Sequence, residues 1–209
     1  MHRSQPPRQR GIFAASLLVL WFGFTLAHAQ NKDSGAIFQA DKGKFSLLLD
    51  GKSIGQEEFE IAPAGGGWVA RGTTTLQTEK TNGAHILFAN GIAKITLEMQ
   101  GARPYEQDLT FGAPLVAVLD NNLYHQYAVL ARLYDWSKGG VQQLPVLIPQ
   151  ELTPGTITLE STGSASAQGK TYEGLRVATS DLEILLLLDS KHKLMRIEVP
   201  SARVSVVRD

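Results

Sequence analysis

Short runs of alternating apolar and polar residues recur from residue 43 onward and predict a domain built mainly of β-strands. The clearest run places Ile95, Leu97 and Met99 at every second position, with polar residues between them. Successive side chains of a strand point to opposite faces of a sheet, so this run predicts a strand with one apolar face and one wet face. The other predicted strands, which bring the set close to ten, cover residues 45–49, 52–61, 68–76, 84–89, 141–148, 156–160, 171–179, 182–188, 194–199 and 202–207.

Two dipeptides between such runs predict tight hairpin turns. Asp50-Gly51 and Asn90-Gly91 each combine residues that tolerate the positive φ angles of a type I′ turn. In the strand that follows the first turn, Gly55 is a position where a β-bulge would reset the register. Loops or turns are also expected over residues 63–67, 80–83 and 163–169.

One segment departs from the strand pattern and predicts a single amphipathic helix that ends before Gly139. Its apolar residues recur at helical spacing behind Asp120-Asn121, which is a good N-cap candidate. The stripe consists of Leu123, Tyr127, Leu130 and Tyr134. We expect this stripe to dock the helix onto the sheet rather than to form a cofactor site, because amphipathic helices commonly bury such a face.

The N-terminal residues have the organisation of a signal peptide. Three arginines occur in the first ten residues, an uncharged and mostly apolar run follows over residues 12–26, and Ala27 and Ala29 then stand before Gln30. Small residues at these two positions fit signal peptidase, which predicts cleavage after Ala29. The alternative is an uncleaved membrane anchor, but the apolar run is shorter than the roughly 20 residues that a spanning helix needs.

The chain is therefore predicted to consist of a signal peptide (residues 1–29), a polar, flexible lead-in (30–42) and one antiparallel β domain (43–209). After cleavage about 180 residues remain, enough for one domain with a substantial core. We expect a protein of the periplasm or the extracellular medium without a stable membrane span.

Charge and cysteine content narrow the range of functions. The chain has 20 basic and 20 acidic residues, and three of the basic residues stand in the leader, so acidic residues are in excess by three after cleavage. This balance does not suggest a nucleic-acid-binding surface. The chain has 0 Cys, which removes disulfides, thiolate nucleophiles, cysteine-ligated zinc and lipidation at the cleavage site.

Signatures of catalysis and cofactor binding are missing from the sequence. The histidines beyond the leader, His85, His125 and His192, are isolated from one another, so none belongs to a zinc motif. No Gly-x-Ser-x-Gly nucleophile motif or nucleotide-binding glycine loop occurs. We therefore assign no catalytic residue, metal ligand or cofactor. His125, on the predicted helix, is the one histidine for which an acid–base role remains as an alternative, with Asp120 or Asp135 orienting it and Tyr124 and Tyr127 nearby.

An acidic group, Glu57, Glu58 and Glu60, lies in the strand that follows the first hairpin turn. Glu58 and Glu60 are expected on one face of that strand and Glu57 on the other. Paired carboxylates can bind calcium or hydrolyse glycosides, but solvated charges on a strand face are far commoner. We therefore expect these three carboxylates to be solvent-exposed.

The run over residues 182–188 is apolar on both parities after Glu183. Half of these side chains would be exposed on a sheet with one wet face, so a helix, a partner subunit or an apolar ligand has to cover the second face. The helix is the simplest cover. If a ligand is bound instead, the residues that we expect to contact it are Leu185, Leu187, Leu123 and Tyr127.

Two stretches resemble a known group of proteins. The first runs from Phe45 through Asp50-Gly51 to Glu57, with Ile54-Gly55 between them, and the second is the closing apolar strand followed by Asp189, a turn and residues 194–200. They resemble uncharacterised exported bacterial proteins whose architecture is similar to that of the lipoprotein carriers and receptors of the bacterial envelope. The resemblance covers most of residues 43–208.

The resemblance implies a strongly curved antiparallel sheet, or incomplete barrel, of about ten strands with one amphipathic helix. The carriers bind acyl chains on the apolar concave side of such a half-barrel, so the resemblance also implies binding of an apolar molecule. This chain departs from the carriers because it has one recognisable helix rather than several to form a lid. No residue of a ligand site can be transferred.

Three functions are compatible with these observations. The leading hypothesis is a non-enzymatic protein of the cell envelope that binds an apolar small molecule or a protein partner. The first alternative is a hydrolase that uses His125 with a nearby Asp or Tyr. The second is a structural interaction module.

Overall fold

The computed structural model describes most of the chain beyond residue 37. The described residues are 38–64, 67–77, 80–87, 92–99, 103, 105–110, 117–120, 122–148, 153–179 and 182–209, and over 80–87, 92–99, 105–110 and 153–154 the description is of the backbone. The predicted signal peptide, the first part of the lead-in and the predicted Asn90-Gly91 turn lie outside these residues.

The described chain contains thirteen strands and one α-helix, so the prediction of a mainly β fold with a single helix is confirmed. The bounds are β1 (Asp41–Leu49), β2 (Lys52–Ala64), β3 (Gly67–Leu76), β4 (Lys80–Leu87), β5 (Ile92–Met99), β6 (Tyr105–Thr110), β7 (Ala117–Val118), α1 (His125–Leu133), β8 (Val141–Ile148), β9 (Thr153–Ala167), β10 (Lys170–Ala178), β11 (Glu183–Leu188), β12 (Leu194–Val199), the 3₁₀ turn η1 (Pro200–Ala202) and β13 (Val204–Arg208).

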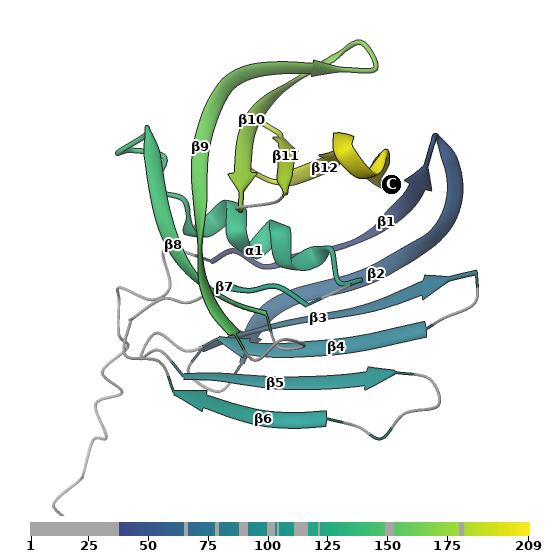
Figure 1. Cartoon of the computed structure of the whole chain (residues 1–209), viewed down its shortest axis with the longest axis vertical. Coiled ribbons are helices and arrows are strands. Elements are labelled where there is room, and N and C mark those ends of the chain that lie inside the picture. Colours follow the sequence, from purple (N-terminus) through teal and green to yellow (C-terminus); the bar gives the residue numbers. More distant parts are fainter. Residues whose placement is uncertain are drawn as a thin grey trace, which may run out of the picture. The chain divides into compact units, whose positions relative to one another are not determined.

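All of these strands belong to one sheet with the order β6-β5-β4-β3-β2-β1-β13-β12-β11-β10-β9-β8-β7. The sheet is strongly curved and does not close on itself (Figure 1). Neighbouring strands are antiparallel except for β7 and β8, which are parallel. The expectation of one curved, unclosed sheet is confirmed. The sheet differs from the expectation in having more than about ten strands and one parallel pair.

Two antiparallel meanders, β1–β6 and β8–β13, are joined where the first strand pairs with the last. Phe45 pairs with Arg208 and Leu47 with Val206, and these four residues lie on the core side of the sheet. The first and last strands of the domain therefore depend on each other. β1 begins at Asp41, two residues before the domain boundary predicted from the sequence.

The first hairpin follows the sequence prediction. Asp50 and Gly51 have φ angles of 51° and 75°, as a type I′ turn requires. The register shifts between Leu47 and Leu48, because Leu47 pairs with Gly55 and Leu48 pairs with Ser53. The predicted bulge beside Gly55 is therefore present.

Two predicted loops are strands instead. β4 already begins at Lys80, and β9 continues through Gly163 to Ala167, with the turn at Gln168 and Gly169. Glycine and alanine have low strand propensity, but pairing with β10 from Thr158 to Ala167 overrides this local preference. Gly163 adopts a φ of 73° beside a register shift between β9 and β10. This glycine, which contributed to the prediction of a loop, therefore marks an irregularity within the strand.

Helix α1 lies on the concave side of the sheet (Figure 1). Its residues Ala128, Val129, Leu130 and Ala131 join one core cluster with buried side chains from both meanders. The predicted docking of the helix onto the sheet is confirmed, and Tyr127 and Leu130 of the predicted stripe take part in it, but Leu123 and Tyr134 are buried just outside the bounds of α1. The predicted N-cap at Asp120 is wrong, because the helix starts after Tyr124, which is its N-cap residue and makes no side-chain capping bond.

The apolar strand β11 is buried on one face and largely buried on the other, where Leu185 is half-buried. Ile184, Leu186 and Leu188 are buried in the core cluster that also contains residues of α1. Leu187 lies on the other parity and is 2% exposed, paired with Arg196 of β12. The aliphatic stem of an arginine can cover apolar surface, and η1 also contacts β11.

Candidate functional site

The N-terminal end of α1 carries a buried pair of ionisable residues, Glu57 from β2 and His125 from the helix. Both side chains are 0% exposed, and Glu57 Oε1 lies 2.5 Å from His125 Nδ1. A carboxylate has only acceptor oxygens, so the ring nitrogen donates. The other oxygen, Glu57 Oε2, accepts the backbone N–H of Tyr124 at 2.8 Å and that of His125 at 3.1 Å. Glu57 thus caps the helix from a strand that is distant in sequence.

Gly72 of β3 makes room for this pair. A Cβ atom at this position would lie 2.4 Å from both Glu57 Oε1 and His125 Nδ1, a separation that atoms in proteins do not tolerate. Gly72 pairs with Phe59, whose ring stacks on the His125 imidazole with a centroid distance of 6.3 Å and an interplanar angle of 10°. Glycine inside a strand often marks such a close approach.

The expectation that all three glutamates are solvent-exposed is wrong for Glu57. Glu57 occupies the parity of Phe59 and Ile61, which is the buried face of β2, while Glu58 on the opposite face is exposed. The prediction that Glu57 lies on the other face from its two neighbours is confirmed. A buried carboxylate is costly unless it is paired and hydrogen-bonded, and the helix supplies these partners.

The four other residues considered as partners of His125 differ in their surroundings. Asp135 accepts hydrogen bonds from the Ser137 hydroxyl at 2.6 Å and from two backbone N–H groups, and these bonds lower the pKa of its carboxyl group. It follows the C-terminal end of α1, whereas His125 is the first residue of the helix. Asp120 is buried, and its backbone N–H donates to the Gln126 side chain at 2.5 Å. In the hydrolase hypothesis an Asp orients His125. In the structure Glu57 is the carboxylate beside His125 Nδ1.

The two tyrosines flanking His125 are held in their neutral form. Burial, together with the Glu57 charge, raises the pKa of Tyr124, and burial raises that of Tyr127 to about 12, with Tyr124 adding to the effect. A general base has to be deprotonated near the operating pH. A raised pKa therefore makes both phenols poorer general bases near neutral pH than an ordinary tyrosine.

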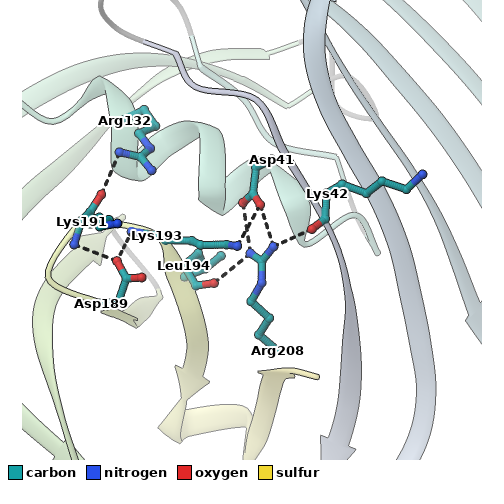
Figure 2. Close-up of polar contacts among 8 residues, drawn as sticks. All are labelled: Asp41, Lys42, Arg132, Asp189, Lys191, Lys193, Leu194 and Arg208. Carbon is teal, nitrogen blue, oxygen red and sulfur yellow. Dashed lines mark hydrogen bonds and ion pairs between the residues drawn. The ribbon is translucent and has the colours of Figure 1, made fainter.

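A second polar cluster surrounds Arg208 near the other half of α1, and Figure 2 shows its members. Arg208 donates to both oxygens of Asp41, at 2.6 and 3.0 Å, and also to the backbone carbonyls of Lys42 and Leu194. Its guanidinium also lies over the Phe59 ring, 5.1 Å from the centroid. This cluster fastens the last strand to the first strand.

Beside this cluster, α1 approaches the turn between β11 and β12 (Figure 2). Arg132 donates from Nη1 to the backbone carbonyl of Lys191 at 2.9 Å, and Lys193 Nζ lies 3.5 Å from Asp41. Asp189 holds the turn by accepting two backbone N–H groups, those of Lys191 at 2.8 Å and Lys193 at 2.9 Å.

The four residues proposed to line a ligand site do not lie together. Leu123 is buried just before α1, and Tyr127 packs against the core cluster from the helix. Leu185 and Leu187 lie on the opposite parity of β11 from the residues that face this cluster. They do not form one cavity with the helix residues.

The backbone register of the sheet links β5 to a core position of β3. Ala70, a core residue of β3, pairs with position 85 of β4, which pairs with Ile95 of β5. Leu97 and Met99 share the parity of Ile95. The principal contacts of α1 are with β2, β3, β7 and β12, so the helix is centred on a part of the sheet that does not include β4–β6.

His192 lies apart from the N-terminus of α1, and for His85 only the backbone is described. His192 Nε2 lies 2.8 Å from a Glu173 carboxylate oxygen, and its ring stacks on Trp136 with a centroid distance of 3.9 Å. His85 occupies the position in β4 opposite Ala70. Among the described residues, no group of three His, Asp or Glu side chains could hold a metal ion.

In the same part of the chain, no helix has the length and apolar character needed to cross a membrane. No protein-family model and no curated protein matches the chain in sequence. The resemblance to envelope lipoprotein carriers therefore stays an expectation that rests on the turn motifs and the architecture.

Proposed function

We propose that the chain is an exported, non-enzymatic protein that binds a molecule with a long hydrocarbon chain on the concave face of β4–β6. The observation that carries this proposal is the register of the sheet. It continues the core face of β3 into the alternating apolar residues of β5, whereas α1 is centred on β2, β3, β7 and β12. An apolar sheet face that extends past its covering helix is a surface on which a hydrocarbon chain would gain free energy by leaving water.

The alternative, a hydrolase that uses His125, has less support. The imidazole is 0% exposed and is bonded to a carboxylate that also caps the helix. A general base has to come within hydrogen-bond distance of its substrate. Substrate could reach His125 only if α1 moved away from β2 and β3.

The proposed location is the periplasm or the extracellular medium. This part of the proposal rests on the arginines, the apolar run and the alanine pair of the first 29 residues. A soluble carrier of an apolar molecule between membranes would need to be exported without a membrane span. A protein partner on the same face is the competing outcome of the experiment below.

Titration of the exported chain with a fluorescent long-chain fatty acid tests the proposal. The parent protein, whose N-terminal sequence is expected to begin at Gln30, should bind the fatty acid with saturation. Leu97→Asp should abolish binding because it places a charge on the apolar parity of β5. Thr96→Asp, on the opposite parity, is the matched control and should bind like the parent.

Urea melts of both variants show whether each is folded. A folded parent that fails to bind the fatty acid, or equal binding by the two folded variants, would contradict the proposal. If the parent fails to bind but associates through this face with another protein, the structural interaction module becomes the better hypothesis.

A further inference from the structure

The hairpin of β9 and β10 extends beyond the strands on either side of it. On one side, β8 begins opposite Glu160, and on the other side, β11 ends opposite Glu173. The residues between these two positions form a two-stranded arm, which projects at the top of Figure 1. Among the described residues, the β9 strand of this arm, from Ser164 to Ala167, therefore has no neighbouring strand on one edge.

The turn of the arm determines which backbone groups face this free edge. The two-residue turn at 168–169 has φ angles of 51° and 75°, as in a type I′ turn, and Ala167 pairs with Lys170 across it. Residues that flank such a turn exchange both of their hydrogen bonds, and hydrogen-bonded and non-hydrogen-bonded pairs then alternate along the hairpin. The N–H and C=O groups of Ser164 and Ser166 therefore point away from β10, toward the free edge.

This edge lacks the features with which proteins usually protect an exposed strand. Exposed edges commonly carry charged residues or proline, because their backbone groups otherwise pair with another strand. Residues 161–169 contain no charged residue and no proline. Ser164 and Ser166 are exposed, and Ala165 between them is half-buried. The edge thus presents accessible backbone donors and acceptors without a side chain that would repel a second strand.

The same segment of a second molecule is complementary to this edge. When two copies of β9 run antiparallel about a two-fold axis at Ala165, Ser164 of each copy pairs with Ser166 of the other. The outward N–H and C=O groups of both serines then have partners in the other copy. The side chains that meet in this register are those of serine and alanine, so neither like charges nor large groups oppose each other.

We propose that the chain associates with a second copy of itself through the β9 edge of the arm, so that the two sheets continue into each other across a two-fold axis. This inference does not depend on the proposed function. The contact is small compared with the interface of a permanent dimer, so we expect weak association. Sedimentation velocity of the exported chain should show a dimer whose fraction increases as the protein concentration is raised to about 1 mM.

A proline substitution tests the edge. Ser166→Pro removes an N–H group that the hairpin itself does not use, so the arm should stay folded while the edge loses a donor in each copy. Thr171→Pro is the matched control, because Thr171 pairs with Ser166 and its N–H group points to the opposite edge of the arm. Ser166→Pro should stay monomeric at the concentration at which Thr171→Pro and the parent associate, and urea melts show that both variants are folded.

Cross-linking tests the register, because the chain has 0 Cys of its own. In the proposed dimer the two copies of residue 165 lie directly opposite each other, at a separation that a disulfide can bridge. Ala165→Cys should therefore form a covalent dimer when oxidised glutathione is added. The two copies of residue 167 lie four residues apart along the strands, roughly 13 Å, so Ala167→Cys should cross-link at least about tenfold more slowly.

Three results would each overturn the proposal. The first is a parent protein that stays monomeric up to about 1 mM. The second is a folded Ser166→Pro variant that associates as the parent does. The third is an Ala165→Cys variant that cross-links no faster than Ala167→Cys, which would show that any association of the chain uses another surface or another register.

Discussion

The two ends of α1 use polar residues in opposite ways. At the N-terminal end, Glu57 and His125 are removed from water and satisfy each other and the first N–H groups of the helix. At the C-terminal end, Arg132 and Lys193 line a small cleft. Arg132 donates to a neutral backbone carbonyl, and Lys193 lies beside Asp41, which is already paired with Arg208. The first arrangement suits a fixed anchor of the helix, because every partner is internal. The second leaves charge available to a molecule from outside.

The anchor at the N-terminal end should have the largest effect on stability. Glu57→Ala removes the acceptor of the His125 ring and of two backbone N–H groups at a buried site. Breaking a buried pair in this way costs about 3–5 kcal/mol. We therefore expect the free energy of unfolding, measured in urea, to fall by about that amount.

Glu58→Ala is the matched control, because Glu58 is adjacent in the same strand but exposed. It should change the free energy of unfolding by no more than about 0.5 kcal/mol. If the two variants are equally stable, Glu57 is not the anchor of the helix.

This anchor also shows where prediction from sequence ends. The alternation of β8 and β12 predicted both strands with their bounds, and Asp50-Gly51 predicted its turn, because these signals are local. The cap on α1 is not local, since Glu57 and His125 are 68 residues apart and their contact exists only after the sheet has formed.

One local signal nevertheless pointed to the buried pair. Gly72 interrupts an otherwise β-favouring strand. A glycine inside a strand indicates that another group approaches the sheet closely at this point. By contrast, β9 from Gly163 to Ala167 carries no strand signal of its own and is set by its pairing with β10. The cleft at Arg132 was missed because its walls come from α1, the start of β1 and the turn before β12.

The tyrosines near the anchor give a smaller effect that depends on pH. The pKa of Tyr127 is raised to about 12 in the folded protein, while an unfolded tyrosine ionises near pH 10. The folded state therefore keeps a proton that the unfolded state loses. The contribution of neutral, buried Tyr127 to the free energy of unfolding is fully present below about pH 10 and is lost as the pH rises toward 12.

Tyr127→Phe has no phenol to ionise, so its stability should fall less steeply than that of the parent over this range. The difference between the two slopes should integrate to no more than about 3 kcal/mol, as two pKa units imply. Urea melts between pH 9 and pH 12 measure both slopes, and absorbance at 295 nm reports how many of the five tyrosines ionise. If the slopes are equal and all five tyrosines ionise near pH 10, burial does not raise the pKa of Tyr127.

The smallest effect on stability is expected at the open end of the helix. Arg132→Gln removes a charge, but glutamine can still donate to the Lys191 carbonyl, and the hydrogen bond is exposed to water. Substitutions at exposed sites without a special role change the free energy of unfolding by about 0.5 kcal/mol or less. We expect Arg132→Gln to stay within this range, as measured by urea melts of the variant and the parent protein. A loss of stability comparable to that of Glu57→Ala would show that Arg132 anchors the helix as Glu57 does, and the contrast between the two ends would then no longer hold.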